Sequence, residues 1–185
     1  MHGPSQVQDT AYAWRHPEWQ ERARAESLAL GRRDLAFEDL EKLPAIGLCM
    51  KEALRLIAPV PSMPRRTLKD MEFKGIHIPA RSLISITPLF AHHMAEHWHL
   101  PERFDPERFL EPRQEHKRHP YQYVPFGGGA HMCIGLHFAE MQIKAVIHQV
   151  VQQWRWSVPA DYDMPLDITS LPSPADKLPV KLERL

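Results

Sequence analysis

Cys133 is the side chain in this sequence whose surroundings point most clearly to chemistry. It belongs to the glycine-rich run FGGGAHMCIG, residues 126–135, and stands just before a predicted helix. The free N–H groups and the dipole at a helix N-terminus favour a thiolate over a thiol. Glycines lack side chains and tolerate positive φ, so they let the backbone pass close to another group. A thiolate here could attack a substrate or bind a metal ion, and a buried, inert thiol is the alternative.

Several common sites do not fit this glycine-rich run. A nucleotide-binding loop is disfavoured because no Gly-Lys-Ser/Thr sequence follows the glycines. A zinc site is disfavoured because the other cysteine, Cys49, is far away and no C-x-x-C motif occurs. The attachment motif of c-type haem, C-x-x-C-H, is absent as well.

Prolines predict where the helices that hold this loop lie, because proline breaks helix interiors. The sequence contains 18 prolines but leaves proline-free windows at residues 18–43, 45–58 and 126–158. We expect helices over residues 17–30, 37–43, 44–57 and 135–153, a β-hairpin over 71–78, a strand over 82–87 and long coil over 99–125. Short strands and turns are expected after Pro159.

Apolar side chains at helical spacing predict the buried faces of two of these helices. In the helix over residues 44–57 they are Ile46, Cys49, Met50, Ala53, Leu54 and Ile57. In the helix over residues 135–153 they are Leu136, Ala139, Ile143, Val146, Ile147 and Val150, followed by Trp154. We therefore expect both stripes to be buried.

Composition and charge narrow the class of protein. A chain of 185 residues with 43% apolar and 25% charged residues is typical of one soluble globular domain. The 23 basic and 23 acidic side chains cancel, and nucleic-acid-binding proteins carry a basic excess, so we expect no nucleic-acid partner. The presence of only two cysteines favours a reducing, cytoplasmic location. We also expect neither a signal peptide nor a membrane segment, because no suitable apolar run occurs.

Three motifs, in this order along the chain, resemble the cytochrome P450 family. Lys51–Arg55 carries the family's E-x-x-R motif, and Phe104–Phe109 resembles its P-E-R-F element. The run at residues 126–135 matches its haem-binding signature, F-x-x-G-x-[R/H]-x-C-x-G. The resemblance covers nearly the whole chain from about Trp14 onward.

The resemblance implies both a fold and a reaction. The implied fold is mainly α with small β-sheets (α+β): three main helices, a β-hairpin region, a long proximal coil and the cysteine loop. The implied cofactor is haem b, with Cys133 as the proximal ligand of its iron. The implied reaction is insertion of one oxygen atom of O₂ into a lipophilic organic substrate. A haem-binding or interaction module without turnover is the alternative.

The resemblance also implies that this sequence is part of a larger domain. Family members are more than twice as long as this chain. We therefore expect residues 1–185 to form a partial domain, the C-terminal portion, without the distal half.

Glu52 and Arg55 have two interpretations. Spaced three residues apart on one helix face, they are expected to form an ordinary surface ion pair. The resemblance instead implies that Arg108 folds back onto them, so that a buried network ties the coil beneath the cysteine loop.

The resemblance further implies contacts with haem and substrate. Phe126, Gly127, His131 and Gly135 would contact the haem. Arg65 (rather than Arg66) would face a propionate, whose charge suits a guanidinium, and a solvated strand edge is the alternative for the two arginines. Segments 58–63 and 170–174 correspond to regions that line the substrate pocket. From them we expect contacts from Ala58, Val60, Met63 and Leu171.

Two groups of charged or titratable residues remain. His92, His93, His97 and His99 resemble a metal-binding tract, but we expect solvated histidines on a surface helix instead. A basic patch is expected from Arg113, Lys117, Arg118 and Lys144. It would attract an acidic electron donor such as a ferredoxin, a flavodoxin or a reductase, and a solvated loop is the alternative.

Overall fold

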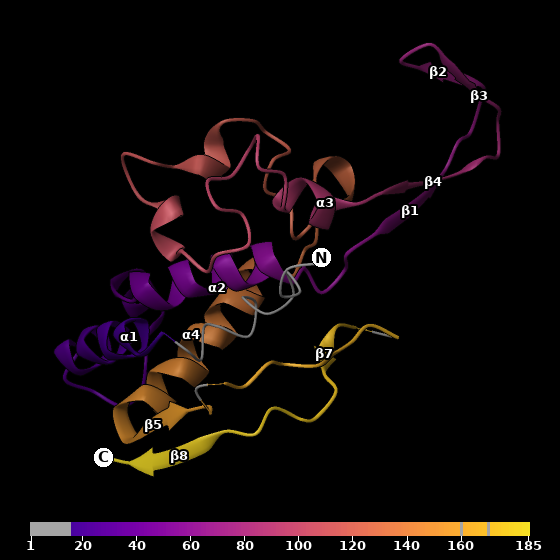
Figure 1. Ribbon diagram of the computed structural model, residues 1–185. Coiled ribbons are helices and arrows are strands. Elements are labelled where there is room, and N and C mark those ends of the chain that lie inside the picture. Colours follow the sequence, from indigo (N-terminus) through magenta and orange to yellow (C-terminus); the bar gives the residue numbers. More distant parts are fainter. Residues whose placement is uncertain (1–15, 160, 170) are drawn as a thin grey trace.

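Three helices form the body of the computed structural model, which describes residues 16–159, 161–169 and 171–185. They are α1 (Pro17–Ala29), α2 (Pro44–Leu56) and α4 (Leu136–Gln153), and each packs against the other two. The short helix α3 (Pro88–His92) lies near the end of α2 (Figure 1). The predicted helices are therefore confirmed to within one or two residues.

Proline sets the starts of most of these helices. It occupies the first turn of α1, α2 and α3, where a missing N–H costs nothing and the fixed φ suits the helix. The segment predicted to be helical over 37–43 is a 3₁₀ helix, η2 (Phe37–Lys42). Helix α1 is followed by Gly31 at φ +65°, a backbone conformation that glycine adopts readily.

Four two-stranded antiparallel sheets complete the regular structure of the described residues. They pair β1 (Met63–Arg66) with β4 (Leu83–Ile86), β2 (Met71–Phe73) with β3 (Ile76–Ile78), β5 (Trp154–Ser157) with β8 (Lys181–Arg184), and β6 (Leu166–Asp167) with β7 (Ser173–Pro174). Figure 1 shows β1 and β4 as an arm that leaves the helices, with the β2–β3 hairpin at its tip. The predicted hairpin and the strand over 82–87 are confirmed, and with them the mainly α fold with small sheets.

The long coil predicted over residues 99–125 is also confirmed. Its regular parts are the 3₁₀ helices η3 (Pro106–Phe109) and η4 (Glu115–Lys117). The rings of Trp98, Phe109 and Tyr123 pack at centroid distances between 5.2 and 6.2 Å. Because aromatic rings pack well in such tilted arrangements, they hold the coil together without regular strand pairing, and Trp98 and Phe109 also belong to the core shared with the helices.

The hydrophobic core lies where the three long helices meet this coil. Its buried members are Trp19, Ala23, Leu43, Ala45, Ile46, Leu48, Leu56, Trp98, Phe104, Phe109 and Val151. Of the stripe predicted for α2, only Ile46 is fully buried, and the expectation that the whole stripe is buried is wrong. The more buried side of α2 is the one that carries Glu52 and Arg55.

The stripe predicted for α4 is also wrong in part, because Ile143 and Val146 are exposed. The fully buried side chains of this helix are Lys144, His148 and Val151. Lys144 Nζ donates a hydrogen bond to the Leu40 carbonyl at 2.9 Å, and His148 Nε2 lies 3.1 Å from the Arg33 carbonyl. These polar side chains are buried because they satisfy backbone carbonyls of the connection between α1 and α2.

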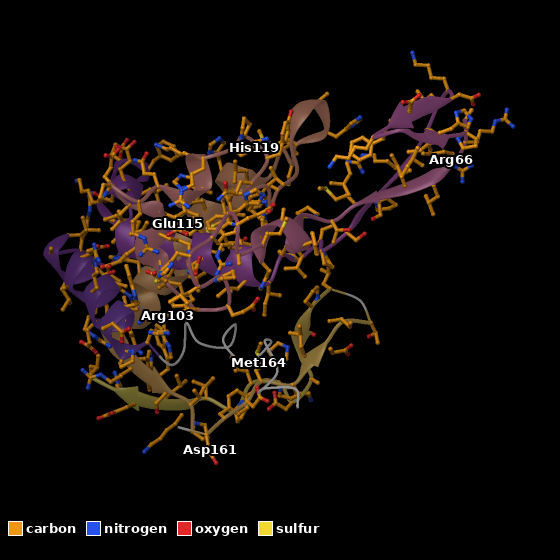
Figure 2. The ribbon with its side chains drawn as sticks, turned by 45° about the horizontal axis from the view of Figure 1, so that its top comes forward. Arg66, Arg103, Glu115, His119, Asp161 and Met164 are labelled. Atoms are coloured by element: carbon orange, nitrogen blue, oxygen red, sulfur yellow. The ribbon has the colours of Figure 1, made fainter. Side chains whose placement is uncertain are left out.

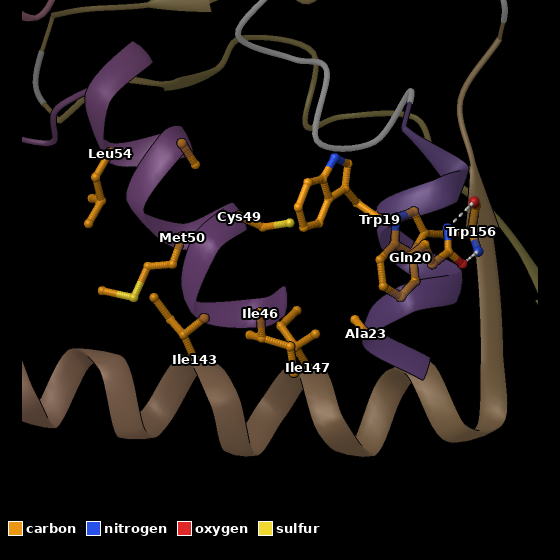
Figure 3. Close-up of a pocket in the computed structure, with 11 residues that line it drawn as sticks. Trp19, Gln20, Ala23, Ile46, Cys49, Met50, Leu54, Ile143, Ile147 and Trp156 are labelled. Carbon is orange, nitrogen blue, oxygen red and sulfur yellow. Dashed lines mark hydrogen bonds between the residues drawn. The ribbon is translucent and has the colours of Figure 1, made fainter. Parts of the chain in front are cut away.

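An apolar cavity of about 240 Å³ separates the predicted stripes of α2 and α4. Figure 3 shows Met50 and Ile143 facing each other across it, with Trp19 of α1 at its other end. There Gln20 and Trp156 of β5 exchange two hydrogen bonds, Nε2 to carbonyl at 3.1 Å and amide to Oε1 at 3.0 Å. Most of the α2 stripe, with Ile143 and Ile147 of α4, therefore lines this cavity, and Ile46 also belongs to the packed core.

Within the described ranges, no helix is both long enough and apolar enough to cross a membrane.

Candidate functional site

The cysteine loop is a compact turn held by its own backbone. The Cys133 amide donates to the Phe126 carbonyl at 2.9 Å, and a 3₁₀ helix, η5 (Gly129–His131), fills the interval. Gly127 and Gly129 adopt φ of +77° and +68°. These are left-handed values that favour glycine, which explains the glycine-rich run.

The thiol of Cys133 is exposed at the entrance to α4. The Gly135 amide, at the N-terminal boundary of α4, donates to the Cys133 Sγ atom at 3.3 Å. Cys133 and His131 are both exposed. The amide hydrogen bond holds the orientation of this exposed sulfur, which is accessible to a ligand. The alternative of a buried, inert thiol at this position is wrong.

The other cysteine is different. Cys49 lines the apolar cavity between α1, α2 and α4, and burial raises the pKa of its thiol to about 12. Free thiols in apolar surroundings are inert, so Cys49 is not a candidate ligand or nucleophile.

The donors present near Cys133 fit a group that brings most of its own metal ligands. In the part of the chain that the structure describes, no group of three or more His, Cys, Asp or Glu residues could hold a metal ion. A single exposed cysteine sulfur is a donor set that fits a haem, because the macrocycle supplies most of the ligands of its iron.

Glu52, Arg55 and Arg108 form a buried network. Arg55 Nε and Nη2 donate to the two carboxylate oxygens of Glu52 at 2.8 and 2.9 Å, and Arg108 Nε donates to Oε1 at 3.0 Å. All three side chains are 0% exposed. The expectation of a surface ion pair is therefore wrong, because the coil covers this face of α2.

Acidic and basic residues of the coil extend this network, which the sequence did not indicate. Arg108 Nη1 donates to Glu115 at 2.8 Å, and Arg113 donates to Glu115 at 2.7 Å and to Asp105 at 2.8 Å. Burial by itself raises the pKa of Glu115, but the hydrogen bonds from Arg113, from the His99 amide and from Arg108 outweigh it and lower that pKa. The sequence signal that could have indicated this extension is the presence of Arg113 and Glu115 two residues apart in the coil.

This extension changes the predicted basic patch. Arg113 is paired within the network, and Lys144 is buried and forms an ion pair with Glu140 at 2.8 Å. Lys117 and Arg118 are exposed and are the part of the patch that a partner could reach.

The prediction of solvated histidines in the cluster of His92, His93, His97 and His99 also needs a correction. His92 is 0% exposed, so the expectation of a solvated side chain is wrong for it. Its Nε2 accepts a hydrogen bond from the Val124 amide at 3.0 Å, and burial, reinforced by the charge of Arg55, lowers its pKa to about 4. The half-buried His93 bonds the carboxylate of Glu102, with each oxygen 3.0 Å from Nδ1.

The two arginines considered for the propionate contact lie on the same strand. Arg65 and Arg66 are neighbours on β1, where consecutive side chains point to opposite faces. Arg65 is half-buried and Arg66 is exposed, and Figure 2 shows Arg66 on the arm, away from the part of the body that carries Glu115 and His119. Arg65 remains the predicted contact.

The residues expected to line a substrate pocket are brought together only in part. Ala58 is buried, whereas Val60 and Leu171 are exposed, and Ser170 lies outside the described residues. Met63 Sδ lies 3.6 Å from the place where a Cβ on Gly127 would stand, so this side chain adjoins the cysteine loop.

Two of the expected pocket segments do meet at one cavity. Ala58 and Pro61 of the first segment and Pro172 of the second line a mainly apolar space of about 530 Å³. Leu166 and Phe90 add to its apolar wall.

Comparison with known proteins identifies the family. The family model described as Cytochrome P450 matches residues 12–181. The chain belongs to the cytochrome P450 family. This is a family of haem-dependent monooxygenases that use redox partners and act on lipophilic substrates.

Individual cytochromes P450 resemble the chain over nearly its full length. A protein named "Putative cytochrome P450 136" from Mycobacterium tuberculosis is 42% identical over 168 residues, which is 90% of this chain and 34% of that protein. "Putative cytochrome P450 120" from Synechocystis is 35% identical over 92% of this chain and 38% of that protein. The chain thus spans about a third of the length of the curated relatives it matches.

A solved structure supports the fold. The structure titled "Retinoic acid bound cyanobacterial CYP120A1" superposes with a TM-score of 0.87 at 33% identity. The match covers 97% of this chain and 42% of that one. The helices, sheets and coil described above are therefore those of part of a cytochrome P450.

Proposed function

We propose that this chain forms the haem-binding part of a monooxygenase and that Cys133 is the axial ligand of the haem iron. The observation that carries the proposal is the exposed Cys133 Sγ atom that accepts the Gly135 amide at 3.3 Å. An amide that donates to a ligating sulfur fixes its orientation and moderates its basicity. Membership of the family supports haem as the cofactor, and we propose haem b.

The haem, when bound, would supply the activation of O₂ and the transfer of one oxygen atom to an organic substrate. The chain's own residues would hold it. Cys133 would supply the thiolate, and Phe126, Gly127 and Gly135 would form the loop surface against the ring. His131 and Arg65 would donate hydrogen bonds to the propionates, since anionic carboxylates accept strong, charge-assisted bonds.

The buried network would have a positioning role rather than a catalytic one. Glu52 and Arg108 join α2 to the coil that ends in the cysteine loop, and neither side chain is exposed to a substrate. The network would thus keep the coil in place while the loop presents the sulfur.

We propose a lipophilic substrate. The apolar space lined by Ala58, Pro61 and Pro172 supports this class, and Val60, Met63 and Leu171 would contribute contacts as well. These side chains are small or apolar, and the two titratable residues that also line the space, His93 and Glu102, bond to each other.

We further propose that a ferredoxin, a flavodoxin or a reductase supplies the electrons, with the exposed Lys117 and Arg118 on the coil as the attracting charges. The proposed location is the cytoplasm, where a free thiol ligand stays reduced. Both proposals concern the activity of a whole cytochrome P450, and this chain spans about a third of the length of the relatives it matches.

A ferrous–CO spectrum of the haem-loaded chain tests the central assignment. The wild-type chain is expected to give the thiolate-type Soret band, and Cys133→Ser is expected to lose it even where haem stays bound. Cys49→Ser is the matched control, because Cys49 lies in the apolar cavity, and it should keep the band. Retention of the band by Cys133→Ser would overturn the proposal.

Turnover is tested separately. With added redox partners, substrate-dependent NADPH oxidation distinguishes a monooxygenase from a haem-binding module without turnover.

A further inference from the structure

We infer that His92 is a positioning residue for the cysteine loop, because its imidazole accepts the amide of Val124 and so couples the loop to the buried network. The inference rests on the proposed function, since it concerns the loop that would present Cys133. It assigns a role to a side chain that the sequence predicted to be solvated.

His92 is bonded to the two parts of the molecule that it would couple. Its carbonyl accepts a hydrogen bond from Arg55 Nη1 at 2.7 Å, and its Nε2 accepts the Val124 amide at 3.0 Å. Arg55 in turn is held by Glu52 through two hydrogen bonds. A displacement of α3 or of the His92 imidazole would therefore change the hydrogen bond to the Val124 amide.

The direction of the hydrogen bond fixes the state of the ring. Because the Val124 amide is the donor, Nε2 must be unprotonated, and the proton of the neutral ring lies on Nδ1. Nδ1 is buried and makes no hydrogen bond among the described residues. An unpaired buried donor is unfavourable, so the Nε2 bond is the polar contact that orients this imidazole. The ring of Tyr123, tilted against the imidazole with centroids 5.4 Å apart, completes its packing.

Val124 is where the coil becomes the loop. Its carbonyl accepts the Gly127 amide at 3.0 Å, and one step further the Phe126 carbonyl accepts the Cys133 amide at 2.9 Å. The path from His92 to the ligand thus consists of three hydrogen bonds, one from the Val124 amide to the imidazole and two within the backbone of the loop. If the Val124 amide were released, the turn that sets the Phe126 carbonyl would lose its anchor.

Neighbouring contacts hold the coil before this point. The Tyr123 hydroxyl donates to the Lys51 carbonyl at 2.9 Å, and Gln122 Nε2 donates to the carbonyls of His97 and Glu115, each at 2.8 Å. They would keep the coil on the body after a change at His92. The expected effect of such a change is therefore local to the loop.

Three variants of the 185-residue chain separate positioning from general destabilisation. His92→Leu keeps much of the volume but removes the acceptor, whereas His92→Gln places a carbonyl oxygen near the position of Nε2. His148→Leu is the matched control: His148 is also 0% exposed with an unpartnered Nδ1, but it bonds the carbonyls of Arg32 and Arg33.

Two measurements are made on each variant. Hydrogen exchange of the peptide that contains Val124 reports the bond without haem, and the share of the thiolate-type ferrous–CO band reports the ligand after haem loading. In His92→Leu we expect about tenfold faster exchange at Val124, the loss that one hydrogen bond produces, and a smaller band share. His92→Gln should restore both, and His148→Leu should change neither.

Each other outcome counts against the inference. Wild-type exchange and band share in His92→Leu overturn it, and so does an equal loss in His148→Leu. If His92→Leu does not fold, His92→Gln decides: wild-type behaviour supports the role of the acceptor, and loss of the band overturns it. If the wild-type chain itself lacks the thiolate band, the proposed function fails, and exchange at Val124 still tests the His92 contact.

Discussion

At the scale of single residues, the stability of this protein depends on whether each buried charged side chain has all of its hydrogen-bond partners. Glu52 accepts hydrogen bonds from Arg55, from Arg108 and from the Asp105 amide at 2.8 to 3.0 Å. Burial of these ions is unfavourable by itself, and it is offset only while every partner is present. The three side chains should therefore behave as one unit.

Glu52→Gln and Arg108→Met are each expected to destabilise the chain by about 3–5 kcal/mol, because each leaves an uncompensated buried charge. The double variant should lose little more than either single variant, since both changes break the same contact. Urea unfolding midpoints measure this. Arg155→Met removes the exposed pair with Glu21 and should change the midpoint little. Small, additive losses would contradict a coupled network.

His92 gives stability a defined dependence on pH. Its pKa, lowered to about 4 by burial and by the charge of Arg55, lies below that of an unfolded histidine, near 6.5. Between these values the unfolded chain binds a proton that the folded chain does not. The contribution of His92 to stability is therefore fully present above pH 6.5 and is lost as the pH drops toward 4.

The free energy of unfolding that is lost between pH 6.5 and 4 through His92 is about 3 kcal/mol at most. Urea midpoints between pH 4 and 7 should fall with a shallower slope in His92→Gln than in the wild type. Glu115, whose pKa is lowered, loses its contribution at still lower pH and does not account for this window. Equal slopes in the two proteins would show that His92 does not cause this pH dependence.

At the scale of elements, the cysteine loop depends on two left-handed residues. Gly127 and Gly129 have positive φ, whereas Gly128 is extended at φ −159°. Gly127→Ala and Gly129→Ala should each cost about 1–2 kcal/mol and reduce the share of thiolate-type band, because an L-residue is strained in that region.

Gly128→Ala is the matched control for these two variants. Its new Cβ would meet the Tyr121 ring at 3.4 Å, an ordinary contact, and the backbone would be unstrained. The loop variants are compared by denaturant midpoint and ferrous–CO spectrum. If Gly128→Ala lowers both as much as Gly127→Ala does, volume rather than backbone conformation limits the loop.

At the scale of the whole molecule, large apolar side chains remain exposed. Phe138 and Val146 of α4 are 62% and 54% exposed, and Ile134 beside the cysteine is fully exposed. Contiguous exposed apolar surface promotes association.

The isolated chain without haem is therefore expected to associate as its concentration rises. Sedimentation velocity over a range of concentrations would measure this. Phe138→Lys with Val146→Lys should reduce the association, whereas Glu107→Lys on the coil should not. A monodisperse chain at every concentration would contradict the expectation.

Electron-donor docking is also a property of the whole surface. Because Arg113 and Lys144 are paired, Lys117 and Arg118 carry the proposed attraction. Lys117→Glu with Arg118→Glu in the haem-loaded chain should slow association with an acidic ferredoxin at low salt. The difference should shrink near 0.15 M salt, where the Debye length is about 8 Å. Lys69→Glu with Lys74→Glu on the arm is the control and should leave the association rate unchanged. Equal rates for the wild type and the Lys117/Arg118 variant would show that these two residues do not attract the electron donor.

The sequence by itself determined the local features of this protein. Proline positions located the helices, the Lys74–Gly75 turn located the hairpin, and the motif around Cys133 indicated the family. Each of these depends on a few consecutive residues, because φ restrictions and helix termini act over one or two turns.

Only the tertiary structure decided which side chains are buried and what they bond. Glu52 meets Arg108 across 56 positions and His92 meets Val124 across 32, so no local pattern could show that these polar groups lose their water. The buried side of α4 likewise follows from backbone carbonyls on a distant connection and not from the spacing of its apolar residues. Burial is set by what the rest of the chain places on a surface, and helical periodicity records only which residues share that surface.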